Sequence, residues 1–331
     1  MERKIMNKPL FSFLAVLAFC KIFIASAFFL ISYRTEIGDK QAHTVIIPQH
    51  TPVNQIAAIL KQNHIIAADI PFKLWSYVLR PFGSLKAGEY EFIPPHRAGD
   101  IIAKLQRGET IVHRFTVVEG VTSAEIAKQL KDLPSLQGEC VLPEEGTLLP
   151  ETYHFAYSDK RSDLIKRMQK AFQKEIQKLW QTRSSLLPYK NIEEAVTLAS
   201  LVEKETAIPE ERPRVVAVFL NRLRIGMPLQ CDATVLYGLY RDKGLALNRH
   251  LSKAELKAPT PYNTYLHKGL PPTPICNPGL ASLRAVFAPS ETKELYFVAN
   301  GKGGHEFSET YTAHSKYHKT WRQIRNKKAS N

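Results

Sequence analysis

Residues 193–205 read EEAVTLASLVEKE, and this segment constrains the fold more than any other part of the chain. Its middle is an almost uninterrupted run of apolar residues that favour helices, so the helix needs partners on nearly every side. The 331 residues, 44% of them hydrophobic, are enough to build such a core. The run ends in Glu203 and Glu205, and carboxylates are rarely buried unless they are paired or catalytic.

The two carboxylates differ in their position around the helix. Two residues apart, they point about 200° away from each other and cannot act as a facing pair. Glu205 continues the line of Leu198 and Leu201 along one edge of the apolar face, and Glu203 falls on the other edge. Burial at an apolar edge raises the pKa of a carboxyl, as a general acid needs. The alternative is that both are surface residues paired with Lys204 or nearby arginines.

The N-terminus predicts a membrane anchor. Residues 1–8 are basic, and the apolar residues 9–33 are long enough to span a bilayer. Lys21 within this span costs about 2.5–3.5 kcal/mol, which the surrounding Leu, Ile and Phe residues offset. The positive-inside rule then predicts a cytoplasmic tail at 1–8 and an exported remainder. The ASA sequence at 25–27 leaves a cleaved signal peptide as the alternative, although the apolar run continues past it.

The formal charge of +14, from 45 basic and 31 acidic residues, suits nucleic acid, anionic lipid or a polyanionic polymer. An exported domain does not meet nucleic acid, so the charge favours an anionic envelope surface or polymer. Three cysteines, Cys140, Cys231 and Cys276, lie outside the anchor and lack metal-binding spacing, as do the histidines, so we expect no metal. An oxidising compartment would permit one disulfide and one free thiol.

Three segments share one plan, VIIPQHTPVNQIAAIL, YEFIPPHRAGDIIAKL and FTVVEGVTSAEIAKQL. Each has a short apolar strand, a Pro or Gly turn, and a helix with apolar residues three and four apart. This repeated unit resembles the LysM-like modules of cell-wall proteins and predicts a small α+β domain over residues 41–140. The alternative is an α+β spacer with no ligand of its own.

The second half of the chain predicts a scaffold and a site. Residues 162–183 favour a helix with one apolar stripe and a solvated charged face. Residues 237–280 are rich in Pro, Gly, Asn and Tyr and predict ordered loops, which often line sites. Residues 294–310 predict a strand, a Gly-rich turn and a second strand.

Five separated motifs occur in order in this half: EGTLLPETYHF, ASLVEKET, VFLNRLRIGMPLQCDATVLYGL, PTPYNTYLHKGLPPTPICNPG and YFVANGKGGHEFSET. Together they resemble the endolytic murein transglycosylases, the YceG-like or MltG-type family. The match covers most of residues 145–320, and an anchor followed by LysM-like repeats is similar to the family's layout. Two departures are Ala233, where the family usually has Pro, and TAHSKY near the C-terminus in place of an E-H-N form.

The resemblance implies an α+β protein with a single transmembrane helix, the LysM-like domain, and a mixed α/β catalytic domain at 145–331 with a loop-lined groove. It implies a lyase of the inner membrane, with its catalytic domain in the periplasm, that cleaves the β-1,4 bond between N-acetylmuramic acid and N-acetylglucosamine in nascent peptidoglycan. Such enzymes leave 1,6-anhydro ends, terminate glycan elongation and use no cofactor. The implied partners are glycan strands, the membrane and peptidoglycan synthases, not nucleic acid. A non-catalytic wall-binding scaffold and a hydrolytic muramidase on the same fold remain alternatives.

The resemblance assigns the acid/base role to Glu205, with Glu203 as second choice, and the helical wheel agrees. One titrating carboxyl suffices, because the C6 hydroxyl of the muramic acid replaces water as nucleophile. Candidate substrate-binding residues are those whose amides, hydroxyls or rings suit sugars: Asn221, Gln230, Asp232, Thr234, Tyr262, Asn263, Thr264, Tyr265 and His305. The two tyrosines are expected to stack on sugar rings, and His305 to bind substrate or orient Glu205. The Asn and Thr residues suit turn stabilisation equally well.

Overall fold

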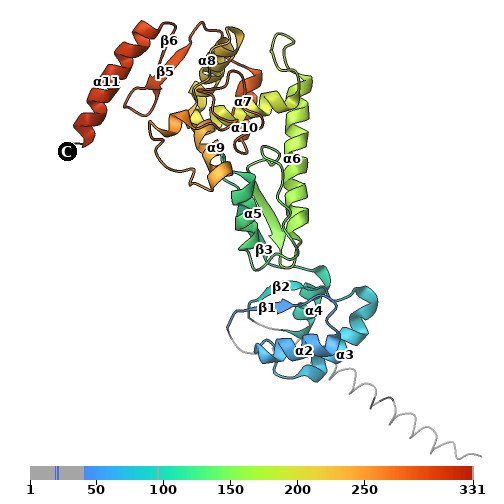
Figure 1. Ribbon diagram of the computed structural model, residues 1–331. Coiled ribbons are helices and arrows are strands. Elements are labelled where there is room, and N and C mark those ends of the chain that lie inside the picture. The colour runs from blue at the N-terminus through green and yellow to red at the C-terminus, as the bar shows by residue number, and fades with distance from the viewer. Residues whose placement is uncertain (1–18, 20, 22–40, 95–96, 330–331) are drawn as a thin grey trace, which may run out of the picture. The chain divides into compact units, whose positions relative to one another are not determined.

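The structure is a computed structural model that describes residues 19, 21, 41–94 and 97–329 (Figure 1). The predicted tail at 1–8 and nearly all of the predicted anchor at 9–33 lie outside this part. Among the described residues, no helix is long and apolar enough to cross a membrane. The described residues divide into two compact units: those up to His113, with 156–158, form the first, and 114–155 with 159–329 form the second.

The first unit is a two-stranded sheet packed with helices. Its elements are β1 (His43–Ile47), α2 (Val53–Gln62), α3 (Asp69–Leu79), the 3-10 turn η1 (Arg80–Phe82), β2 (Gly88–Phe92) and α4 (Ala98–Arg107). The strands are antiparallel, with His43 opposite Phe92. The apolar positions predicted for the first two strand–turn–helix units are buried in one core around Tyr90 and Phe72. Both local predictions are therefore confirmed.

The third strand–turn–helix unit also forms, as β3 (Val112–Thr116) and α5 (Ser123–Lys131). The helix begins with a capping box, in which the Thr122 hydroxyl accepts the backbone N–H of Glu125 and the Glu125 carboxylate accepts that of Thr122. Strand β3 pairs with β4 (Thr152–Ala156). Most of β3 and all of α5 belong to the second compact unit, so the units divide near residue 113, whereas the sequence grouped all three repeats over 41–140.

Helix α6 (Arg161–Gln181) agrees with the scaffold helix predicted at 162–183. Its apolar stripe serves two cores of the second unit. Ile165 and Met168 pack with α5 and β4, whereas Phe172 and Ile176 pack into the larger core that surrounds α7. Because one long helix contributes to both clusters, it packs against both the β3–β4 region and the helical region and connects them.

Helix α7 (Ile192–Glu205) carries the segment EEAVTLASLVEKE. Asn191 caps its start by accepting the backbone N–H of Glu194 at 2.9 Å. The eight residues 195–202 are all buried, as the sequence predicts. In Figure 1, α7 lies among α8 (Arg212–Arg224), α9 (Asp232–Lys243) and α10 (Leu280–Phe287). The 3-10 turn η2 (Pro209–Glu211) connects α7 to α8. This enclosure fixes where the last turn of α7 presents its carboxylates.

The predicted loop region at 237–280 is confirmed for most of its length and wrong at its start. Residues 237–243 are helical, because α9 continues from Asp232 and ends only where Gly244 adopts a left-handed conformation with φ of 65°. Between residues 245 and 279, all of which the structure describes, the one regular element is the 3-10 turn η3 (Glu255–Lys257). Buried Asn263 orders this loop: its amide donates to two backbone carbonyls at 2.9 and 3.0 Å, and its oxygen accepts the N–H of Tyr265.

The predicted strand–turn–strand near the C-terminus is confirmed as the antiparallel hairpin of β5 (Tyr296–Ala299) and β6 (His305–Ser308). Helix α11 (Tyr311–Ala329) follows it and packs along β5, as Figure 1 shows. The hairpin matters for the site because it brings His305 to the end of α7.

Candidate active site

Glu205 is the last residue of α7 and is partly exposed. Dense packing desolvates its carboxyl and raises its pKa, and the charge of Asp232 raises it further. A hydrogen bond with Cys231 and the charges of His305 and Arg222 oppose this shift. The C-terminal end of a helix also disfavours a carboxylate. Glu205 therefore has the environment of a carboxylic acid that keeps its proton to a higher pH than an exposed carboxyl does.

Asp232 and Tyr265 form a second polar group beside Glu205. The Tyr265 hydroxyl donates to Oδ1 of Asp232 at 2.6 Å, and burial, followed by this bond, raises the pKa of Tyr265. Asp232 begins α9, where the positive end of the helix dipole favours its charge. Exposed Gln230 precedes it with φ of 52°, a left-handed conformation that costs a residue with a side chain about 1 kcal/mol or more. Strain of this kind often persists at functional sites.

Two predicted sugar ligands, Thr234 and Thr264, are buried. Thr264 accepts the backbone N–H of Cys231 at 3.0 Å, Thr234 donates to the carbonyl of Cys231 at 2.7 Å, and the two hydroxyls lie 2.9 Å apart. Their exposed fractions are 0% and 1%. These threonines lock residues 230–232 against the 259–279 loop, so they position Gln230 and Asp232 rather than face a ligand.

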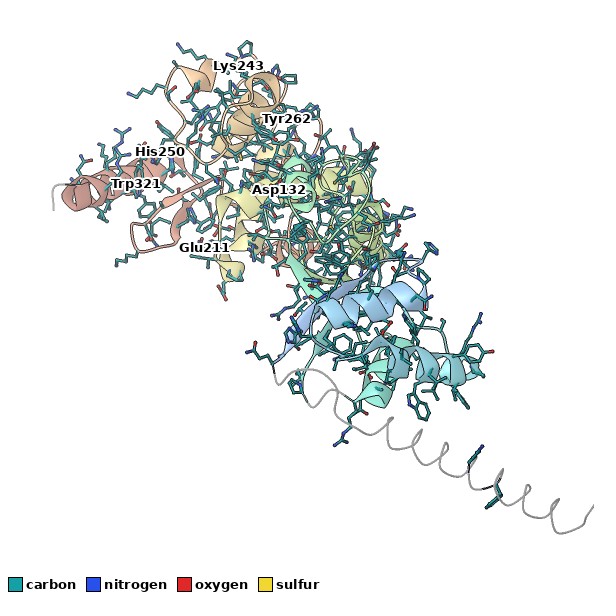
Figure 2. The ribbon with its side chains drawn as sticks, turned by 90° about the horizontal axis from the view of Figure 1, so that it is seen from below. Asp132, Glu211, Lys243, His250, Tyr262 and Trp321 are labelled. Atoms are coloured by element: carbon teal, nitrogen blue, oxygen red, sulfur yellow. The ribbon has the colours of Figure 1, made fainter. Side chains whose placement is uncertain are left out.

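The structure does not bring Asn221, Tyr262 or Asn263 to Glu205. The Asn221 amide donates to two backbone carbonyls just before β5, at 2.8 and 3.0 Å. The Tyr262 hydroxyl bonds Thr273 at 2.8 Å, and its ring is buried. Asn263 orders the loop as described above. Figure 2 shows where Tyr262 lies, with Glu211 labelled in the same view. All three therefore act as structural residues.

His305 lies at the site together with a residue that the sequence did not reveal, Glu211. The backbone N–H of His305 donates to Glu211 Oε1 at 2.8 Å, and its Nδ1 lies 2.7 Å from Oε2. Thr206 donates to the same Oε2 at 3.1 Å. Burial opposes ionisation of Glu211, but the bonds from His305 outweigh it and lower its pKa. Nothing in the charged run PEERPR distinguishes Glu211, since its partner is 94 residues away.

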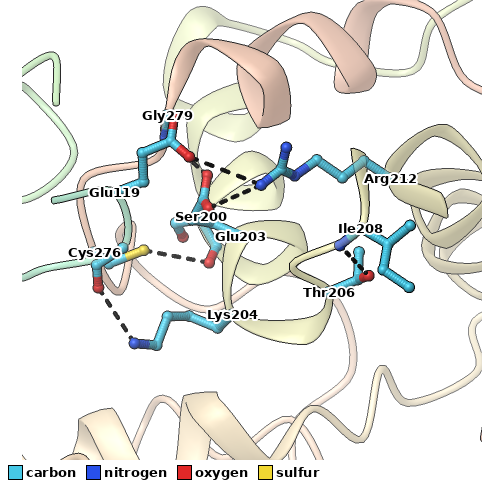
Figure 3. A network of polar contacts seen from close by, with 10 residues as sticks. Glu119, Ser200, Glu203, Lys204, Thr206, Ile208, Arg212, Cys276 and Gly279 are labelled. Atoms are coloured by element: carbon cyan, nitrogen blue, oxygen red, sulfur yellow. Dashed lines mark hydrogen bonds and ion pairs between the residues drawn. The ribbon is translucent and has the colours of Figure 1, made fainter. Parts of the chain in front are cut away.

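Glu203 belongs to an ion-pair network with Arg212 and Glu119, shown in Figure 3. Arg212 lies 3.4 Å from Glu203 and 3.8 Å from Glu119, and the backbone N–H of Gly279 donates to Glu203 at 2.8 Å. The side chains of Glu203 and Arg212 are only 6% and 7% exposed. Glu203 is thus paired with a cation and hydrogen-bonded, which is the arrangement of a structural carboxylate.

Arg222 is a second residue that the sequence did not single out. Its guanidinium donates to the carbonyls of Leu295 and Leu229, each at 2.7 Å, and lies over the ring of Tyr296. Burial lowers its pKa, and its charge acts on Glu205. The NRL motif contains Arg222 and could have drawn attention to it. The motif alone does not show that this arginine, on α8, lies near the end of α7.

A cavity of about 1000 Å³ in the second unit does not include Glu205 among its lining residues. It opens beside Ile192 and Val196 in the first half of α7, about 14–20 Å along the helix from its last residue. Residues of the predicted loop region line part of it: Tyr237, Tyr240, Arg241, Gly244, Pro272, Thr273 and Pro274. The carboxylate of Glu145 lies at this wall, where burial raises its pKa.

Within the described ranges, no group of three or more His, Cys, Asp or Glu side chains is arranged to hold a metal ion. Cys140, Cys231 and Cys276 are free thiols. Cys231 and Cys276 are buried, and Cys231 reaches Glu205 through its side chain. The site is therefore built from carboxylates, a tyrosine, a histidine and a buried arginine.

Comparisons with known proteins place this geometry in a family. Residues 45–320 match the YceG-like family. A Bacillus subtilis (strain 168) protein named endolytic murein transglycosylase is 30% identical, with 93% of each chain covered. A Streptococcus pneumoniae (serotype 2, strain D39) protein of the same name is 28% identical over 80% of this chain and 55% of its own. The crystal structure of a yceG-like protein from Listeria monocytogenes, 29% identical, has a TM-score of 0.50 and covers 84% of this chain and 99% of its own. The chain belongs to the YceG-like family.

Proposed function

We propose that this chain is an endolytic murein transglycosylase. It cleaves the β-1,4 bond between N-acetylmuramic acid and N-acetylglucosamine within nascent peptidoglycan and leaves 1,6-anhydro ends. The observation that carries the proposal is the contrast at the end of α7. There, Glu205 is desolvated with a raised pKa, whereas Glu203, two residues earlier, is neutralised by Arg212. The names of the Bacillus and Streptococcus relatives support the same reaction.

Glu205 serves first as acid and then as base. Its proton passes to the glycosidic oxygen as that bond breaks, and the carboxylate then takes the proton of the muramic C6 hydroxyl, whose oxygen attacks the anomeric carbon. The proton is returned to Glu205 and no water is consumed. A single carboxyl carries both steps, unlike the two-carboxylate glycosidases.

Substrate binding beside the reacting bond falls to Gln230, Asp232, Tyr265 and His305, the candidates that lie near Glu205. Exposed Gln230 offers an amide to hydroxyl and acetamido groups. The cavity along the first half of α7 suits the strand beyond the cut, because its wall combines tyrosines and prolines with Thr273 and Arg241. Aromatic faces and planar polar groups together are suited to sugars.

A hydrolytic muramidase is the second candidate, and Asp232 favours it. Its charge acts on Glu205, so a water held by Asp232 could replace the C6 hydroxyl as nucleophile. The hydrogen bond from Tyr265 occupies one oxygen of Asp232, which favours the transglycosylase over this reaction.

The placement of the reaction is part of the proposal. The apolar residues 9–33 anchor the chain in the inner membrane with residues 1–8 in the cytoplasm. The LysM-like region at 41–140 and the catalytic domain at 145–331 then lie in the periplasm, next to new strands. Cleavage there ends elongation, and peptidoglycan synthases are the expected partners.

The experiment is product analysis by mass spectrometry. The full chain in detergent is incubated with uncrosslinked nascent peptidoglycan, beside Glu205→Gln and Glu203→Gln variants. Products with 1,6-anhydro ends that disappear in Glu205→Gln support the proposal. Reducing ends would assign a muramidase. Binding of glycan without cleavage by the wild type would favour a scaffold.

A further inference from the structure

We propose that Glu211 is a positioning residue for the proposed reaction: it holds His305 beside Glu205 with the ring proton on Nδ1, leaving Nε2 to face the reacting groups. The inference rests on the proposed function for its catalytic meaning. The position of the ring proton on His305 can be measured independently of catalytic activity.

The geometry of the Glu211 carboxylate defines the tautomer. Both carboxylate oxygens are hydrogen-bonded to His305: Oε1 accepts its backbone N–H, and Oε2 is bonded to its ring nitrogen Nδ1. An ionised carboxylate can only accept, so Nδ1 must carry a proton. A neutral His305 therefore keeps its lone pair on Nε2, and a charged His305 presents a second donor there.

The packing around the pair fixes the ring as well as its proton. Phe297 meets the imidazole edge-on, with centroids 5.5 Å apart. A side chain at Gly304 would place its Cβ 2.6 Å from Glu211 Oε1, so the close approach of carboxylate and turn needs glycine there. Among the described residues, Nε2 of His305 has no hydrogen-bond partner, which leaves it available to substrate or to Glu205.

Two links run from Glu211 to Glu205. Thr206, the next residue after Glu205, donates to Glu211 at 3.1 Å and accepts the N–H of Ile208 at 3.1 Å, so the end of α7 is tied to the same carboxylate. The charge of His305 also lowers the pKa of Glu205, against the desolvation that raises it. The other ionisable groups that interact with Glu205 include Cys231, Asp232, Arg222 and Tyr265.

This arrangement suits a carboxyl that must be acid and then base. Desolvation alone would keep the proton on Glu205 and hinder formation of the carboxylate that deprotonates the C6 hydroxyl. A held imidazole can hydrogen-bond to that carboxylate once the proton has left. His305 neither gains nor loses a net proton over the reaction.

The test is Glu211→Gln, which keeps the shape of the side chain. A glutamine has one acceptor oxygen and one NH2 group, so it cannot accept both bonds from His305. If its oxygen keeps the backbone N–H, its NH2 faces Nδ1, and the ring proton moves to Nε2. We expect kcat to fall about 100-fold with little change in KM. This is less than the roughly 10⁴-fold loss when the carboxylate of a Ser-His-Asp triad becomes an amide, because His305 is not the proton acceptor.

Glu210→Gln is the matched control, since Glu210 is the exposed neighbour of Glu211 in η2. It should leave kcat, the tautomer and the melting temperature unchanged. Nitrogen-15 NMR of histidine-labelled full chain in detergent reads the tautomer of His305 without using activity. A wild-type Nδ1–H form that becomes Nε2–H in Glu211→Gln is the expected result.

A double variant separates positioning from a general structural effect. If Glu211 acts through His305, then Glu211→Gln combined with His305→Ala loses no more activity than His305→Ala alone. Additive losses, an unchanged tautomer in Glu211→Gln, or wild-type kcat in a folded Glu211→Gln would each overturn the inference. Absence of anhydro products from the wild type would instead defeat the proposed function and leave the NMR result standing.

Discussion

The Glu203 carboxylate accepts the backbone N–H of Gly279 at 2.8 Å, and so joins the last turn of α7 to the residue that precedes α10. Its other oxygen lies 3.4 Å from Arg212. Two residues later, Glu205 has no ion pair of this kind with any described residue and is desolvated instead. One helix end therefore presents two carboxylates with opposite roles, one structural and one suited to proton transfer.

The structural role predicts the effect of Glu203→Gln. The amide can still accept from Gly279, but among the described acidic residues Arg212 then keeps the more distant Glu119 as its ion-pair partner. We expect the free energy of unfolding to fall by about 1–3 kcal/mol, the typical loss when a buried polar group loses its partner. Urea unfolding followed by circular dichroism measures this. Unchanged stability with abolished activity would contradict the assignment of roles.

We predict that position 279 needs glycine because the neighbouring side chain of Glu119 leaves no room for a Cβ atom, and not because of its backbone conformation. Its φ is −70°, which any residue tolerates, but a Cβ there would overlap the carboxylate of Glu119. Gly279→Ala should therefore displace Glu119 from Arg212 and destabilise the protein by about 1 kcal/mol or less, because Glu119 is nearly half exposed and its side chain can move aside. The double variant Gly279→Ala with Glu119→Ala should recover part of this loss. Purely additive effects would show that the overlap is not the cause.

The raised pKa of Glu205 predicts that the stability of the protein depends on pH. Its folded pKa is raised above the ordinary 4.5, so between these values the folded state binds more protons than the unfolded state. Stability contributed by this carboxyl is therefore full below about pH 4.5 and is lost as the pH rises through the folded pKa. Glu205→Gln does not titrate and should melt higher than wild type at pH 8, with the difference shrinking towards pH 4. A pH-independent difference in melting temperature, with Glu210→Gln as control, would argue against a raised pKa.

The cavity along α7 predicts a dependence on strand length. Gln173 lies on the exposed face of α6 and lines the cavity, so Gln173→Trp fills part of it without disturbing the core. Cleavage of long strands should slow about tenfold, equivalent to about 1.4 kcal/mol of lost binding, while short fragments are cut normally. Gln177→Trp, one turn along and also exposed, is the matched control. Equal effects of both variants on long strands would rule out the cavity as a binding site.

The sequence predicted those features that depend on local periodicity. The buried run of α7, the stripe of α6 and the three strand–turn–helix units each follow from the spacing of apolar residues within one element. The loop prediction was wrong at Tyr237–Lys243 because it relied on the content of Tyr and Gly, which is typical of loops. These residues are in a helix that begins at Asp232 and ends before Gly244. Composition is a weaker guide than the signals at helix ends.

The site was only partly predictable because its contacts join distant segments. Asn221 and Tyr262 were chosen by residue type, and type does not show that their polar groups already bond within the protein. Glu211 was missed because its role depends on His305, 94 residues further along. Glu205 was assigned from the resemblance of its segment to the family motif, and its position at the edge of the apolar face of its own helix gave local support.

The most direct test of the account is the product of Glu205→Gln beside Glu203→Gln on nascent uncrosslinked glycan, analysed by mass spectrometry. We predict 1,6-anhydro ends from wild type, none from a fully folded Glu205→Gln, and residual anhydro product from Glu203→Gln in proportion to its folded fraction. Anhydro products from Glu205→Gln at the wild-type rate would contradict the central claim that this carboxyl is the acid.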